Sequence, residues 1–278
     1  MQIIEVKPGV YACLTPKPAS NAGFVAGERG VLVVDALFTP SAGRELASAV
    51  AEHTGKPVLL LVNTHHHSDH VFGNQAFEAP IVAHSLLAGE LSRAAARDLS
   101  PESRAAWIAE HPEDRWLVDE LEIRYPNVIF EDRLLVDLPP RHMIVRHLGG
   151  HTLDSAIVDL PEDEVLFAGD LVFEGRTPYL LNAGFRATVT ALRSLEQLGR
   201  RTVVPGHGAL CDIAYIQHFR EFLEALTGGV RRLLETGWSK QAILDSGELP
   251  QWWTSDRPEL QRANVARLID ELAGQDTQ

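Results

Sequence analysis

Short apolar runs bounded by turn residues recur along residues 1–212. Such runs, rich in valine, isoleucine and phenylalanine, predict β-strands. They occupy residues 3–15 and 21–37, each broken by a turn, and then 57–65, 80–84, 127–138, 141–148, 154–160, 164–170 and 201–208. Strands separated by helical segments are typical of the α/β class.

Apolar residues at helical spacing fill the segments between and after these strands. Helices are predicted over residues 41–54, 85–120 and 184–199, and over most of the chain after residue 212. Ser41 is the predicted N-cap of the first helix, and Gly55 stands just past its end. Because no linker or repeat interrupts the pattern, we expect one domain over residues 1–278. It has a core of about 1–212 and a helical C-terminal segment, 213–278.

Composition narrows the choice of partners. The chain has 278 residues, 45% of them hydrophobic, and a formal net charge of −13. This acidic balance argues against nucleic-acid and anionic-membrane partners. No apolar run reaches the ~18 residues that span a bilayer, and the N-terminal stretch lacks a signal-peptide pattern. We therefore expect a cytoplasmic monomer or homodimer that acts on a small molecule.

The segment THHHSDH, residues 64–70, concentrates four histidines and one aspartate directly after a predicted strand. His65 and His67 are two positions apart and project to the same side of an extended loop, where both can bind one metal ion. Asp69 and His70 point differently and can reach a second site. Imidazole and carboxylate ligands suit zinc, and iron or manganese stays an alternative.

Three later residues stand in similar places. His151 follows two glycines after a strand, Asp170 ends the predicted strand VLFAGD, and His207 lies between two glycines in VVPGHG. A lone histidine or aspartate of this kind is more often structural. Together with the first motif, however, their shared position at strand ends predicts a metal site.

In this order and spacing, THHHSDH, GGHT, FAGD and VVPGHG resemble the metallo-β-lactamase superfamily over residues 1–212. The resemblance implies an αββα sandwich with a two-metal site at one edge. Carried over by position, one metal would be held by His65, His67 and His151 and the other by Asp69, His70 and His207, with Asp170 bridging them. Asp35 would support the site from behind, and His66 would point away from it.

The identity of the bridging residue separates the subfamilies. Zinc β-lactamases with this first motif usually carry cysteine or serine where this chain has Asp170, whereas thioesterases, lactonases and phosphodiesterases of the superfamily carry aspartate. Longer stretches, such as LPEDEVLFAGDLVFEGRTPYL, resemble the thioesterases and cyclases of bacterial aromatic polyketide pathways. The resemblance therefore favours an acyl hydrolase over a β-lactamase or a nuclease.

The implied activity is hydrolysis of a thioester, lactone or other ester by a hydroxide that bridges two zinc ions. Asp69 and Asp170 are the expected catalytic carboxylates. A zinc-dependent polyketide cyclase or lyase is the main alternative, and β-lactamase or phosphodiesterase activity is less expected. A non-catalytic metal-binding module would need saturated coordination, whereas this ligand set leaves positions open on both metals.

Substrate contacts are expected from aromatic residues outside the metal motifs. The candidates are Tyr179, Trp107 and Trp116, followed by Tyr125, Trp252 and Trp253. The segment 85–125 and the C-terminal helices carry most of them. We therefore expect these two regions to set the choice of substrate.

Overall fold

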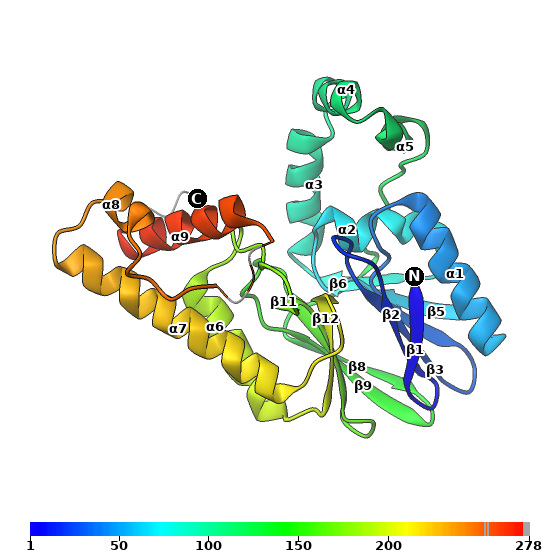
Figure 1. Cartoon of the computed structure of the whole chain (residues 1–278). Coiled ribbons are helices and arrows are strands. Elements are labelled where there is room, and N and C mark those ends of the chain that lie inside the picture. Colours follow the sequence, from blue (N-terminus) through cyan, green and yellow to red (C-terminus); the bar gives the residue numbers. More distant parts are fainter. Residues whose placement is uncertain (253, 255, 275–278) are drawn as a thin grey trace.

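Two β-sheets pack face to face in the computed structural model, with helices on both outer faces (Figure 1), over the described residues 1–252, 254 and 256–274. This arrangement confirms the expected αββα sandwich of the α/β class with additional C-terminal helices. No helix in the described part of the chain combines the length and hydropathy needed to cross a bilayer.

The first sheet contains the strands of the N-terminal half in sequence order. These are β1 (Gln2–Lys7), β2 (Val10–Leu14), β3 (Ala22–Ala26), β4 (Val31–Val34), β5 (Val58–Val62), β6 (Ile81–His84) and β7 (Val128–Phe130). Strands β1 to β4 pair antiparallel, and β4 to β7 pair parallel. The carboxyl ends of the parallel strands consequently meet at one edge, where the histidine-rich segment leaves β5.

The second sheet has the order β12-β11-β10-β9-β8. Its strands are β8 (Arg133–Leu138), β9 (Arg141–His147), β10 (Ala156–Leu160), β11 (Val165–Phe173) and β12 (Thr202–His207). The prediction that Asp170 ends its strand was wrong, because β11 continues to Phe173. The pairing with β12 shifts register on both sides of Gly169, whose φ is +51°. This irregularity redirects the strand without ending it.

The helices fall into three sets along the chain. They are α1 (Pro40–Thr54), α2 (Ser68–Val71) and the 3₁₀ helix η1 (Phe72–Ala76); then α3 (Leu87–Asp98), α4 (Pro101–Glu110), η2 (Pro112–Asp114) and α5 (Trp116–Asp119); then α6 (Phe185–Leu198), α7 (Ile213–Glu235), α8 (Lys240–Asp245) and α9 (Pro258–Leu272). In Figure 1 the middle set projects away from the sheets, and the last set covers the second sheet.

The first helix starts earlier than predicted. Thr39, and not Ser41, is its N-cap, because the Thr39 hydroxyl accepts a hydrogen bond from the Ala42 N–H at 3.0 Å. Pro40 then fills the first helical position, where its missing N–H costs nothing. Gly55 ends the helix in the left-handed conformation, as predicted.

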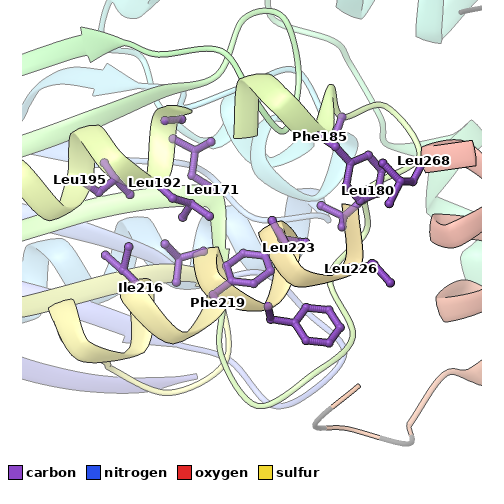
Figure 2. Packing of buried hydrophobic residues seen from close by; sticks show 14 of the residues in the cluster. Leu171, Leu180, Phe185, Leu192, Leu195, Ile216, Phe219, Leu223, Leu226 and Leu268 are labelled. Carbon is purple, nitrogen blue, oxygen red and sulfur yellow. The ribbon is translucent and has the colours of Figure 1, made fainter. Parts of the chain in front are cut away.

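Three apolar layers hold the sandwich together. Valines and leucines from both sheets fill the space between them, and α1 covers the first sheet. The third layer joins β11, α6, α7 and α9 (Figure 2). Leu223 and Phe219 of α7 are fully buried in this layer beside Leu192 of α6 and Leu268 of α9. The C-terminal helices thus share one core with the second sheet, which supports a single domain.

Replacing Leu223 with Ala is expected to lower the free energy of unfolding by about 2–5 kcal/mol, the range for emptying a buried leucine site. Denaturant unfolding followed by circular dichroism measures this, and one transition is expected for the whole chain. Leu135→Ala is the control, since Leu135 is 68% exposed and should cost less than about 0.5 kcal/mol. Two separate transitions, with only one shifted by Leu223→Ala, would contradict the single domain.

Candidate metal centre

Seven predicted side chains meet at the edge where the loops of both sheets converge. They form two sets. The first contains His65, His67, His151 and Asp170, and the second contains Asp69, His70 and His207. Within each set all ligand atoms lie within 4.8 Å of one another. The loop after β5 and helix α2 supply the first motif, and β9, β11 and β12 lead to the other three. We call His65, His67 and His151 the three-histidine group, and Asp69, His70 and His207 the mixed group.

The three-histidine group presents its nitrogens to a common point. His151 Nε2 lies 3.0 Å from His67 Nδ1. The Asp170 Oδ2 atom lies 3.5 Å from His151 Nε2 and 3.8 Å from His65 Nε2. Three imidazole nitrogens and a carboxylate oxygen therefore converge, which is a donor set suited to zinc.

The mixed group adjoins the first through Asp170. His207 Nε2 lies 3.2 Å from Asp69 Oδ2, and His70 Nε2 lies 3.9 Å from the same oxygen. Asp170 Oδ1 is 3.1 Å from His70 Nε2, and Asp170 Oδ2 is 3.4 Å from His207 Nε2. One carboxylate thus borders both groups, as the resemblance implied for a bridging residue.

The centre of the cluster contains buried polar atoms without a hydrogen-bond partner among the described residues. They are His65 Nε2, His70 Nε2 and Asp170 Oδ1. Orphaned buried polar atoms are rare because each costs free energy. A cation bound to the lone pairs of these atoms would satisfy them. The residues therefore fit a metal cofactor.

Asp35 fixes the orientation of two of the histidines. Its Oδ2 accepts a hydrogen bond from His70 Nδ1 at 2.8 Å and another from the Thr64 hydroxyl at 2.8 Å. The same hydroxyl lies 3.1 Å from His65 Nδ1. Both rings thereby carry their proton on Nδ1 and turn Nε2 toward the centre, as in other supported metal sites. Asp35 adopts a φ of +59°, a conformation that aspartate tolerates better than most residues.

Two contacts orient the other ligands, and sequence reasoning missed both. Asn182 Oδ1 lies 3.3 Å from His67 Nε2, which leaves His67 Nδ1 for a metal. The Ala19 carbonyl lies 3.1 Å from His207 Nδ1, which leaves His207 Nε2 facing Asp69. The chain separations are 115 and 188 residues, so no local spacing could have revealed these partners.

His66 belongs to neither ligand set and turns its Nδ1 atom away from the cluster, as predicted, although it borders the cleft described below. Its Nδ1 atom lies 2.8 Å from Asp154 Oδ1, and the Asp154 side chain is fully buried. This contact fixes the loop between the two ligands His65 and His67. Asp154 carries no motif signal of its own and was not predicted.

The charges of the two groups differ. Burial lowers the pKa of His65 and lowers that of His151 to about 3, so both rings are neutral. Burial also favours neutral His207, but Asp170 and Asp69 outweigh it and raise the pKa of His207 to about 9. Despite burial, His207 and His70 hold the pKa of Asp170 well below its usual range. The mixed group is therefore protonated on imidazole and ionised on carboxylate until a metal displaces the protons.

A cleft of about 1150 Å³ opens over the metal centre, walled by α3 and α4 on one side and by residues 176–182 on the other. Tyr179 lines it, with its ring centroid 5.7 Å from that of His67, and Trp107 lines it from α4. Trp116 is not among the lining residues. Its ring packs edge-on against Phe38 at 5.2 Å, behind the wall.

The remaining aromatic candidates lie elsewhere. Tyr125 is exposed and is not a lining residue, and Trp252 packs against Phe222 of the core at 4.7 Å between ring centroids. Trp253 lies outside the described residues. Sequence reasoning also missed the arginines of the cleft, because single arginines give no pattern.

Comparison with known proteins agrees with the geometry. The family model described as metallo-beta-lactamase superfamily matches residues 16–207. The 2,4-dinitroanisole O-demethylase subunit beta of Nocardioides sp. is 26% identical over 254 residues, which cover 90% of this chain and 67% of that one. The acyl-coenzyme A thioesterase MBLAC2 of Gallus gallus is 29% identical over 206 residues, covering 68% and 72%.

Among solved structures, a stereoselective inverting sec-alkylsulfatase from Pseudomonas sp. superposes with a TM-score of 0.71 at 18% identity. The match covers 96% of this chain and 49% of that one. At this identity the likeness shows the fold alone. The matched region extends beyond the sandwich into the C-terminal helices.

Neighbouring histidines provide a matched test of the ligand assignment. His65→Asn is expected to weaken metal binding by about 10- to 100-fold or more. Mutating a residue that only hydrogen-bonds to a ligand already lowers metal affinity by that much. His66→Asn keeps an N–H donor toward Asp154 and should bind metal like the wild type. Metal content after dialysis and competition with a chromophoric chelator measure both. Equal losses in the two variants would exclude the assignment of His65.

Metal binding should depend on pH at the mixed group only. His207, with a pKa of about 9, and His70, whose pKa is raised well above its usual value, must each lose a proton to bind, so affinity at this group falls as pH falls, about tenfold per pH unit for each displaced proton. His65 and His151 are already neutral and should bind independently of pH in this range. Calorimetric zinc titrations should show two tight equivalents near pH ~8.5 and one near pH ~6.5. Two equally tight equivalents at both pH values would contradict the charge difference.

Proposed function

The chain belongs to the metallo-β-lactamase superfamily, and we propose that it is a zinc-dependent hydrolase of acyl bonds, with thioesters as its first substrate class. The observation that carries the proposal is the Asp170 carboxylate, which borders both ligand groups at the floor of the cleft. The acyl-coenzyme A thioesterase similar to this chain supports thioesters over other acyl substrates.

We assign the three-histidine group to one metal ion, the mixed group to a second and Asp170 to both. Zinc bound there supplies Lewis acidity that activates water and polarises a carbonyl oxygen. The protein contributes fixed ligand orientation, since Asp35 and Asn182 hold the rings from behind. Such preorganisation spares the cost of reordering ligands during the reaction.

Asp69 is the best-placed proton acceptor at the floor of the cleft. Burial opposes its ionisation, but His70 and His207 lower the pKa of Asp69 to about 2, so the carboxylate is charged at neutral pH. It also lines the cleft, unlike His70 and His65. We therefore assign it the proton of the attacking water, which it returns to the leaving group.

The cleft offers an apolar end for the acyl chain. Phe38, Phe72, Leu99 and Leu117 line it beneath α3 and α5. Tyr179 stands on the opposite side, next to His67. A carbonyl placed at the three-histidine group would have its acyl chain against these apolar residues, and the phenol of Tyr179 would border it.

The test is a panel of four substrates offered to metal-loaded protein: an acyl thioester, a lactone, a phosphodiester and a β-lactam. Thioester hydrolysis is expected to be fastest, to stop with a chelator and to return with zinc. Asp170→Ala should lose a metal and at least about 100-fold in kcat/KM, since metal assistance contributes several kcal/mol. His66→Asn is the control. Two bound metals with no turnover of any substrate would favour cyclase or lyase chemistry instead.

A further inference from the structure

Two guanidinium groups stand at one corner of the cleft, beside the mixed group. Arg176 follows β11 and is only 5% exposed, yet it lines the cleft. Its Nη1 atom donates to the Pro18 carbonyl and lies 3.1 Å from His207 Nδ1. Arg257, which lines the same cleft, immediately precedes α9. We call Arg176, Arg257 and the first turn of α9 the arginine corner.

Neither arginine of this corner forms an ion pair within the described chain. Neither Arg176 nor Arg257 has a carboxylate oxygen within 4.0 Å among the described residues, and Arg176 Nε has no hydrogen-bond partner there. The nearby carboxylate of Asp256 accepts hydrogen bonds from the backbone and hydroxyl of Thr177 instead. Arg257 is exposed, whereas Arg176 is buried, and a buried cation without an ion pair is costly, so an anionic ligand is the natural partner of Arg176.

Two arginines on the opposite wall of the cleft differ from those of the arginine corner. Arg93 and Arg97 of α3 also line the cleft, but each pairs with a carboxylate of its own helix, Glu90 or Asp98. Their charges are therefore already compensated. Arg104 of α4 also lines the cleft and has no ion pair among the described residues, but its guanidinium donates to the backbone carbonyls of Leu99 and Leu117. In a protein of net charge −13, the arginine corner places positive charge next to the proposed reaction site.

The start of α9 adds to the positive potential. The helix begins at Pro258, and no side chain caps its N-terminus. The free N–H groups and the helix dipole favour an anion at such an end. Glu259 in the first turn is exposed and has no contact to Arg176 or Arg257 among the ion pairs of the described residues. The buried, incompletely bonded guanidinium of Arg176 points to the same ligand chemistry independently.

We propose that the arginine corner binds a negatively charged group on the thiol carrier of the substrate. This inference rests on the proposed thioester hydrolysis. If the carbonyl lies at the three-histidine group with its acyl chain toward Phe38, the departing sulfur lies toward the mixed group. Arg176 contacts His207 of that group, so the carrier must leave past the arginine corner. Guanidinium groups bind phosphate and carboxylate alike, and either can supply the charge.

Three thioesters with the same acyl group test this. The carriers are neutral N-acetylcysteamine, coenzyme A with its phosphates, and glutathione with its carboxylates. Arg257→Ala is expected to raise KM for the charged carrier about tenfold, in line with the loss of a charge-assisted hydrogen bond, and to change kcat little. The N-acetylcysteamine thioester should show no such rise. A selective effect on coenzyme A identifies phosphate, and one on glutathione identifies carboxylate.

Arg93→Ala is the matched control, because Arg93 lines the same cleft with its charge already paired to Glu90. It should change none of the three KM values by more than about twofold. Arg176→Lys, checked for unchanged metal content, should likewise raise KM for the charged carrier. KM values that rise equally for all three carriers, or for none, overturn the arginine corner as an anion subsite.

A binding experiment distinguishes failure of the proposed thioesterase function from failure of the arginine corner. If no thioester is hydrolysed, equilibrium binding of coenzyme A and of glutathione by calorimetry still tests the corner. Binding of either that weakens about tenfold in Arg257→Ala, and not in Arg93→Ala, supports the subsite without thioesterase activity. Equal binding by wild type and Arg257→Ala overturns it.

Discussion

The buried Asp170 carboxylate is the constraint around which the rest of the molecule is arranged. It lies among four imidazole rings: His65 and His70 come from the segment that follows β5, His151 follows β9, and His207 ends β12. Backbone from β12 must pass very close to it, and a Cβ at Gly206 would overlap the carboxylate. The irregularity at Gly169 turns the strand toward Thr64, which Asp35 holds in turn. The site therefore forms only when the two sheets pack in one position relative to each other.

This arrangement also explains why the unloaded site tolerates so many polar groups. Two ionised carboxylates, Asp69 and Asp170, are offset by protonated His70 and His207, while the three-histidine group stays neutral. Burying ionised groups is costly unless they are paired and hydrogen-bonded. The contacts of Asp69 and Asp170 with the two protonated rings reduce this cost, but His70 Nε2 and Asp170 Oδ1 lack a hydrogen-bond partner among the described residues. Metal ions would take the place of the protons. Rigid support from Asp35 makes this exchange possible.

Sequence patterns were informative where the determining contacts are local. The spacing of His65, His67, Asp69 and His70 brings them to one loop, and strand ends bring His151 and His207 to the same edge. Local reading failed where a neighbour distant in sequence decides the outcome. Asp170 lies inside β11 because β12 continues beside it. The misplaced cap of α1 is a local error instead, since Pro40 suits the first turn and makes Thr39 the N-cap.

Contacts made through space were beyond the sequence for the same reason. Asn182 and Asp154 each fix a histidine of the first motif, but neither forms part of a repeated pattern. Trp116 was grouped with Trp107 as an aromatic of the same segment, and only packing separates them. Trp116 joins a small apolar cluster with Phe38, whereas Trp107 faces the cleft.

The two regions expected to set substrate choice form the two walls of the cleft. The α3–α5 set supplies an apolar surface anchored by Leu87 and Leu91, and it projects from the sandwich (Figure 1). The opposite wall is tied to the core through Asn264 of α9, whose side chain bonds the backbone of Pro178 and Leu180. Neither wall supplies a ligand of the metal centre. Wall residues other than Asn182, which orients His67, and Arg176, which contacts His207, can therefore change in sequence while the ligands keep their geometry. The chemistry and the choice of substrate are therefore set by different parts of the chain.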